Sequence, residues 1–144
     1  MRSRFGERWL TGVGVLFLVF GVVMAVAGGT ELFRAVFGPL IDSAFWEAGV
    51  APEARRFQLW VYGAWGGTVA GFGLLLALVA KPALSEGNRR LRLGALAAVT
   101  VWFLVDTSAS LVFGVWRNAL LVNVPIYLAM ALPLAFADRA SSQL

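Results

Sequence analysis

Four long segments that are almost free of charge constrain this chain more than any other feature. They cover residues 9–30, 57–80, 93–114 and 118–137, and Asp106 is the only charged residue within them. An α-helix needs roughly 20 residues to cross the hydrocarbon core of a bilayer, and each segment has about this length. A backbone in lipid must satisfy its own hydrogen bonds, which favours helices. The sequence therefore predicts an all-α, multi-pass membrane protein whose single domain, residues 1–144, is a bundle of four transmembrane helices.

The composition agrees with a membrane protein and excludes several kinds of site. Only 14% of the residues are charged and 60% are hydrophobic, against roughly 25% and 45–50% in soluble domains. The chain has no cysteine and no histidine, which removes thiolate and imidazole groups as ligands and bases. We therefore expect no metal site and no cofactor. The basic residues form short clusters between the apolar segments, so we expect the lipid bilayer, and not a nucleic acid, as a partner.

The connections between the segments carry unequal numbers of basic residues. One set holds eight, namely Arg2, Arg4, Arg8, Lys81, Arg89, Arg90, Arg92 and Arg139, and the other holds four, namely Arg34, Arg55, Arg56 and Arg117. The positive-inside rule then places both termini in the cytoplasm. Eleven arginines to one lysine fit a GC-rich bacterial genome, so we expect the cytoplasmic (inner) membrane of a bacterium.

The first apolar segment also matches part of the pattern of a signal peptide. It follows a basic start and contains Ala25-Val-Ala27, a motif of small residues like those at cleavage sites. The segment is long for a signal peptide, however, and three more segments follow it. We therefore expect residues 9–30 to remain as a membrane span.

The connection of residues 31–56 contains too many apolar residues to be a free linker. We expect it on the extracytoplasmic side, partly helical, with a short amphipathic helix from Glu31 to Phe37 and then a turn at Gly38-Pro39. A lid folded over the bundle is the alternative. The motif Ala51-Pro-Glu53 predicts the start of the next helix, because proline and an acidic residue are favoured in a first turn.

Small residues recur every four positions in the first two apolar segments. Gly21, Ala25 and Gly29 do so in the first segment, and Gly63, Gly67 and Gly71 in the second. Such ridges let another helix approach closely inside a membrane. We predict helix packing along them, and we name Gly21, Gly63, Gly67 and Gly71 as the surface for a homodimer or for a partner in a membrane complex.

Asp106 is the residue around which we expect a site. The connection around Val115–Arg117 is so short that the third and fourth segments must form an antiparallel hairpin. Asp106 lies about eight residues from the end of its segment, hence roughly 12 Å deep. Burial at this depth disfavours the anion, so the acid should be neutral, paired or facing water. A functional acid is one interpretation, and a packed acid with a structural role is the other.

The depth of Asp106 also predicts its neighbours. Asn123 is the best candidate for a hydrogen bond across the hairpin, and Trp102 and Ser110 share the helix face of Asp106. Trp65 and Thr68 lie at the same depth in the second segment. Arg117 would be the counter-ion of Asp106 if the turn folds it back, and otherwise it anchors the interface with Trp116 and Asn118. The predicted ligand-binding residues are Asp106, Asn123, Ser110, Trp102, Trp65, Thr68 and Arg117.

Several stretches resemble small four-span bacterial integral membrane proteins of unknown function. They are Phe57-Gln-Leu-Trp-Val-Tyr-Gly63, the glycines after it, and Trp102-Phe-Leu-Val-Asp-Thr107 with Ser110, Gly114, Asn118, Asn123 and Pro133. The resemblance covers most of the chain from Phe57 onward and implies the topology without an activity. The chain is unlike small multidrug exporters, because its first span has no acid, and unlike quinone-linked thiol oxidases, because it has no cysteine.

A single carboxylate without a second acid or a histidine matches no common catalytic template, which argues against an enzyme. We expect a binding or transport module that holds a lipophilic or weakly cationic ligand, or a proton, at Asp106. The alternative is a structural or accessory subunit of a larger membrane complex. A third hypothesis is a small lipid-modifying enzyme that uses Asp106 as an acid or base.

Overall fold

The computed structural model describes residues 2–47 and 49–137, with side chains from Arg4 onward. The helices are α1 (Arg2–Ala27), α2 (Glu31–Phe37), α3 (Pro52–Leu84), α4 (Arg89–Val112), α5 (Trp116–Asn118) and α6 (Val124–Ala135), with a 3-10 turn η1 (Asp42–Ala44) and a π-helical segment η2 (Ala119–Asn123). No strand occurs in these described ranges. Four helical stretches, including Trp116–Ala135 as the fourth, are long and apolar enough to cross a membrane. The predicted all-α class with four spans is confirmed.

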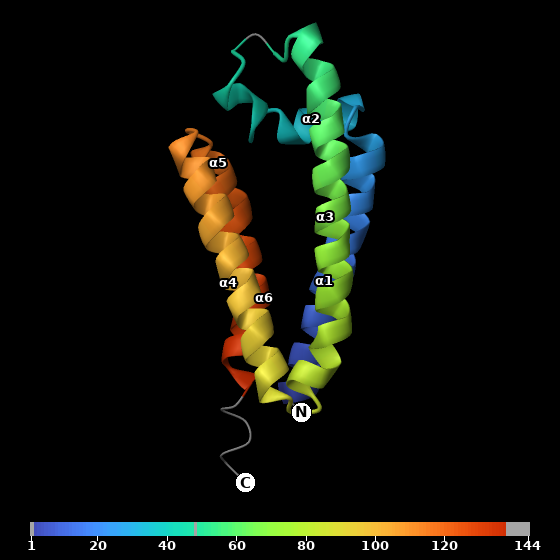
Figure 1. The fold of residues 1–144 in the computed structure, drawn as a ribbon, viewed down its shortest axis with the longest axis vertical. Helices are drawn as coiled ribbons and strands as arrows, with labels where there is room; N and C mark the ends of the chain where they lie inside the picture. The colour runs from blue at the N-terminus through green and yellow to red at the C-terminus, as the bar shows by residue number, and fades with distance from the viewer. Residues whose placement is uncertain (1, 48, 138–144) are drawn as a thin grey trace.

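The four long helices form two pairs that meet at one end and diverge toward the other. Figure 1 shows α1 beside α3 and α4 beside α6. At what we call the closed end, α1 begins, α3 passes into α4 and α6 ends. At the open end, α2 and η1 extend from the α1–α3 pair toward α5. A short connection therefore joins the two pairs at the closed end, and the segment of α2 and η1 spans the gap at the open end.

The core lies at the closed end, where side chains from all four long helices meet. Leu10 of α1, Ala80 of α3, and Met130 and Leu134 of α6 are fully buried there, together with Val99 of α4. Lateral hydrogen bonds add to this packing. The Nε1 atom of Trp9 donates to the carbonyl of Ala129 at 2.9 Å, and Nη1 of Arg92 donates to the carbonyl of Leu134 at 3.0 Å.

Helices α1 and α3 approach each other closely along small residues. A Cβ atom added at Gly21 would lie 2.4 Å from the backbone nitrogen of Ala70, and one added at Gly66 would lie 2.5 Å from the carbonyl of Gly21 and 2.7 Å from the nitrogen of Ala25. Gly14 and Gly73 make similar contacts seven residues away. The packing predicted at Gly21 and Ala25 is therefore confirmed.

The predicted ridge of Gly63, Gly67 and Gly71 does not face α1. A Cβ atom added at any of the three would have no neighbour within 4 Å. Residues four apart rotate by about 40° per step around an α-helix, whereas residues seven apart drift by only about 20°. Positions spaced by seven, such as Gly66 and Gly73, can therefore follow a straight neighbour, and the ridge is left on the outside of the chain.

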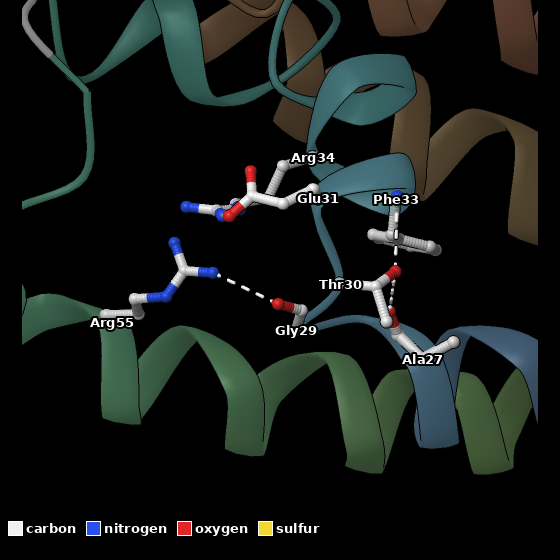
Figure 2. A network of polar contacts seen from close by, with 7 residues as sticks. All are labelled: Ala27, Gly29, Thr30, Glu31, Phe33, Arg34 and Arg55. Carbon is white, nitrogen blue, oxygen red and sulfur yellow. Dashed lines mark hydrogen bonds and ion pairs between the residues drawn. The ribbon is translucent and has the colours of Figure 1, made fainter.

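Helix α2 has the predicted bounds, Glu31–Phe37, and Gly38 follows it. Thr30 caps its first turn, because its Oγ1 atom accepts a hydrogen bond from the nitrogen of Phe33 at 3.3 Å (Figure 2). Phe33 is buried against α3, with its ring 5.3 Å from that of Tyr62. Helix α3 begins at Pro52, as the motif Ala51-Pro-Glu53 predicts. The connection between the first two spans is thus packed on α3 from the first turn of α2 onward.

Candidate functional site

A cleft of about 520 Å³ lies between the two helical pairs toward the open end. Aromatic side chains form much of its wall, among them Phe20 of α1, Phe37 of α2, Trp65 and Phe72 of α3, and Trp102 of α4. The apolar side chains of Leu40 and Ile41, which lie just before η1, also line it. The connection between α1 and α3 thus contributes to the wall of the cleft. Among the described residues, Asp106 is the only charged one that lines it.

Asp106 is held by three neutral donors on one of its two oxygen atoms. Nδ2 of Asn123 donates to Oδ1 at 2.8 Å, Oγ of Ser110 at 3.3 Å and Nδ2 of Asn118 at 3.3 Å. The predicted contacts of Asp106 with Asn123 and Ser110 are therefore confirmed. Thr107 also contacts Asn123, since its Oγ1 atom accepts from Nδ2 at 3.2 Å.

Asn118 belongs to this cluster, although the sequence indicated an interface anchor. Its side chain is buried. Its Nδ2 atom lies 3.0 Å from Oγ of Ser110 and 3.5 Å from Oδ1 of Asn123, in addition to the contact with Asp106. An amide group has only two N–H donors, so these acceptors share it. Asn118 thus joins α5 to α4 and places a second amide beside the acid.

The π-helical segment η2 explains why both asparagines face Asp106. Asn118 and Asn123 are five residues apart, a spacing that separates two side chains by about 140° around an α-helix. In η2 the hydrogen bonds run from i to i+5, as from the nitrogen of Val124 to the carbonyl of Ala119, and residues five apart therefore lie closer to one face than in an α-helix. Pro125 follows at once, and a proline cannot donate to the regular helical ladder. In the sequence, two asparagines five residues apart before a proline are the pattern that indicates this arrangement.

The second oxygen of Asp106 has no hydrogen-bond partner in the part of the chain that the structure describes. None of the described residues donates a hydrogen bond to Oδ2, and no described cation pairs with Asp106. A carboxylate offers about four acceptor positions. Since Asp106 lines the cleft, this oxygen is the one left for a ligand or a proton.

Arg117 lies elsewhere, and of the two roles considered for it the pairing with Asp106 is not formed. Its Nη1 atom donates to the carbonyl of Pro39 at 3.1 Å, and its guanidinium lies over the ring of Trp116 at 5.3 Å. The connection before η1 therefore provides an acceptor that the sequence did not indicate. Arg117 joins α5 to that connection.

Trp65 and Thr68, predicted from their depth, line the cleft, and so does Trp102, predicted on the helix face of Asp106. Thr68 does not join the polar cluster, because its Oγ1 atom donates to the carbonyl of Ala64 in its own helix, at 3.1 Å. The two tryptophans come from α3 and α4, which belong to different pairs. The cleft is therefore flanked by an indole on each side.

A second polar cluster ties η1 to α3. Oδ1 of Asp42 accepts from Nε2 of Gln58 at 2.7 Å and from the hydroxyl of Tyr62 at 3.2 Å. Arg55, one turn earlier in α3, donates to the carbonyl of Gly29 at 3.2 Å (Figure 2). These contacts hold the connection between α1 and α3 on the α1–α3 pair.

Comparison of the chain with protein families, with curated proteins and with solved structures finds no match. The geometry of the cleft therefore has to support any functional proposal by itself.

Proposed function

We propose that this chain is a binding or transport module of the bacterial inner membrane, with both termini in the cytoplasm. Its ligand is lipophilic with a weakly cationic group, or is a proton, and it binds at Asp106. One observation carries the proposal. The only charged residue that lines the apolar cleft, among those described, is an acid with three neutral donors on one oxygen and none on the other.

Electrostatics favour a cation or a proton as the ligand of this acid. A carboxylate without a cationic partner is costly to hold in a medium of low dielectric constant, so a cation or a proton that reaches it is bound favourably. Aromatic walls such as those of Trp65 and Trp102 attract organic cations through their π faces. The same walls favour an apolar ligand body, because the cleft offers little else to contact.

The test uses the full chain in lipid nanodiscs and the lipophilic cation tetraphenylphosphonium, with quenching of tryptophan fluorescence as the signal. We expect Asp106→Asn to weaken binding about tenfold or more, the effect of losing roughly 1.4 kcal/mol. The amide keeps the size of the side chain and an acceptor for Asn123. Glu53→Gln is the matched control, because Glu53 is exposed at the start of α3, away from the cleft.

Unchanged affinity in a folded Asp106→Asn variant would refute the cation site. For the proton alternative, the measurement is proton flux into proteoliposomes loaded with a pH-sensitive dye. Flux that Asp106→Asn abolishes and Glu53→Gln preserves supports a proton site. Circular dichroism and size-exclusion chromatography check that both variants are folded.

A second candidate function is that of an accessory subunit in a larger membrane assembly. It is favoured by the ridge of Gly63, Gly67 and Gly71, where an added Cβ atom would meet none of the described residues within 4 Å. Ridges of this kind are suited to close contact between helices in lipid. Gentle solubilisation should then recover a defined partner or a second copy, and a lone monomer at native expression would argue against this role.

A further inference from the structure

Three arginines converge on a second hollow at the open end, outside the cleft. This hollow, of about 630 Å³, lies among α2, η1, the start of α3 and α5. The charged residues that line it are Arg34, Arg55, Arg117 and Asp42. Three of the four basic residues at this end of the molecule therefore face one space, and Arg56 is the exception.

Two of these guanidinium groups are held by neutral acceptors. Arg55 donates to the carbonyl of Gly29 and Arg117 to that of Pro39. A guanidinium has five N–H donors, so these backbone contacts orient the two groups while leaving most donors free. A carbonyl carries no net charge, so these contacts do not neutralise the positive charge of either guanidinium.

Arg34 adds a third cation beside them. It forms an ion pair with Glu31, but its Nε atom is buried and has no hydrogen-bond partner among the described residues. Figure 2 shows the guanidinium groups of Arg34 and Arg55 pointing toward the same space. Two like charges that point toward one another are stabilised by an anion between them. The chain supplies one anion here, Glu31, which pairs with Arg34, while the Nε donor of Arg34 stays without a partner among the described residues.

The acids nearby leave an excess of positive charge. Three arginines stand against two acids there, namely Glu31, which pairs with Arg34, and Asp42, which lines the hollow and accepts from Gln58 and Tyr62. The hollow also lies at the start of α3, where the rings of Phe57 and Trp60 are exposed two and five residues after Arg55. Exposed aromatic rings are typical of the headgroup level of a bilayer, where phosphate groups are abundant.

We propose that this hollow binds a phosphate group, held by Arg55, Arg117 and Arg34. Arginine forks match the oxygens of phosphate and form charge-assisted hydrogen bonds with them. The phosphate belongs either to a lipid headgroup or to free inorganic phosphate. Residues around η1 and in α5 lie between the hollow and the cleft, since Ile41 and Asn118 line the cleft and Asp42 and Arg117 line the hollow. This anion site is independent of the cation site at Asp106.

The experiment measures binding of three probes to the full chain purified in a nonionic detergent. Dioleoylphosphatidic acid and dioleoylglycerol share their acyl chains and differ by the phosphate, and inorganic phosphate has no acyl chains. Native mass spectrometry counts bound lipid, and isothermal titration calorimetry measures inorganic phosphate. We expect phosphatidic acid to bind and Arg55→Gln and Arg117→Gln each to weaken it about tenfold or more. Arg56→Gln, the matched control, changes it less than about twofold, since an exposed charge away from the site contributes little.

The outcomes separate the sources and can refute the proposal. Binding of inorganic phosphate that Arg55→Gln weakens identifies free phosphate as a ligand, and binding of the phosphatidic acid alone identifies a headgroup. Equal binding of dioleoylglycerol, or equal losses in Arg55→Gln and Arg56→Gln, would overturn the site. Because Arg55 and Arg117 lie on different helices, one variant still tests the proposal if the other does not fold. Asp106→Asn should leave phosphatidic acid binding unchanged, which separates this site from the cleft.

Discussion

One side chain joins the two helical pairs through a hydrogen bond to the carbonyl oxygen of Ala129. Pro133 lies four residues later in α6 and has no N–H to donate, so this carbonyl lacks its usual partner in the helix. Trp9 of α1 provides the missing donor at 2.9 Å. An unpaired carbonyl costs far more in lipid than in water. The proline therefore makes α6 depend on a side chain from the other pair.

Removing the indole N–H should destabilise the protein more while the proline is present than after it is replaced. We expect Trp9→Phe to lower the free energy of unfolding by about 1 kcal/mol, the usual size of one such hydrogen bond. In a Pro133→Ala background the new backbone N–H can bond to Ala129, and the same change should have a smaller effect. Titration with SDS in mixed micelles, followed by circular dichroism, gives the free energy of unfolding of the wild type, of the two single variants and of the double variant. Equal effects in both backgrounds would show that the contribution of Trp9 does not depend on the carbonyl that Pro133 leaves without a partner.

At the same scale, the sequence predicts part of the site at Asp106. The short connection at Val115 determines which residues of the two helices lie at one depth, and so Asn123 could be chosen. Asn118 could not, because counting with an α-helical period places it at the end of the span. The partner of Arg117 was also beyond reach, since it depends on where the carbonyl of Pro39 lies in the folded connection.

At the scale of elements, the contact between α1 and α3 depends on residues without large side chains. Gly14 and Gly21 lie against Gly73 and Gly66, and backbone atoms of one helix approach those of the other. Close backbone approach of this kind stabilises helix pairs where apolar burial gives little driving force. The contacting glycines are spaced by seven, and nearby glycines spaced by four conceal this repeat in the sequence. The sequence therefore indicated the wrong face of α3.

Alanine substitutions should separate the two sets of glycines. Gly21→Ala and Gly66→Ala each place a methyl group against backbone, and we expect losses of about 1–3 kcal/mol in the free energy of unfolding. Gly67→Ala meets no atom within 4 Å and should be neutral or stabilising by up to about 1 kcal/mol, because alanine favours helix. Thermal unfolding in detergent ranks the three variants. A destabilised Gly67→Ala, with Gly21→Ala unaffected, would contradict the assigned contact.

At the scale of the whole molecule, apolar length predicts the four spans, and the short connection predicts the pairing of α4 with α6. The divergence of the two pairs is not predictable in this way. In lipid, helix separation follows from packing among all four helices, because no hydrophobic force brings apolar faces together. The cleft and the hollow beside it both arise from this divergence and from the position of α2 and η1, so neither is visible in any single segment.

The free ridge of α3 allows a test of assembly. If Gly63, Gly67 and Gly71 contact a second copy, Gly67→Leu should reduce energy transfer between labelled copies in vesicles, with association weakened about tenfold or more. Gly12→Leu is the matched control, since Gly12 is exposed on α1 and has no neighbour within 4 Å. Equal transfer in the wild type and in both variants would argue against contact through this ridge.

The position of α2 and η1 over the diverging helices also bears on how the proposed ligand would reach Asp106. This segment covers the cleft at the open end, and the core fills the closed end. A path between the pairs therefore enters sideways, through the acyl chains that surround the helices. For a ligand on this path, occupancy depends on its concentration dissolved in the membrane. Two compounds with equal affinity for the cleft but different partition coefficients would then differ in potency when dosed from water.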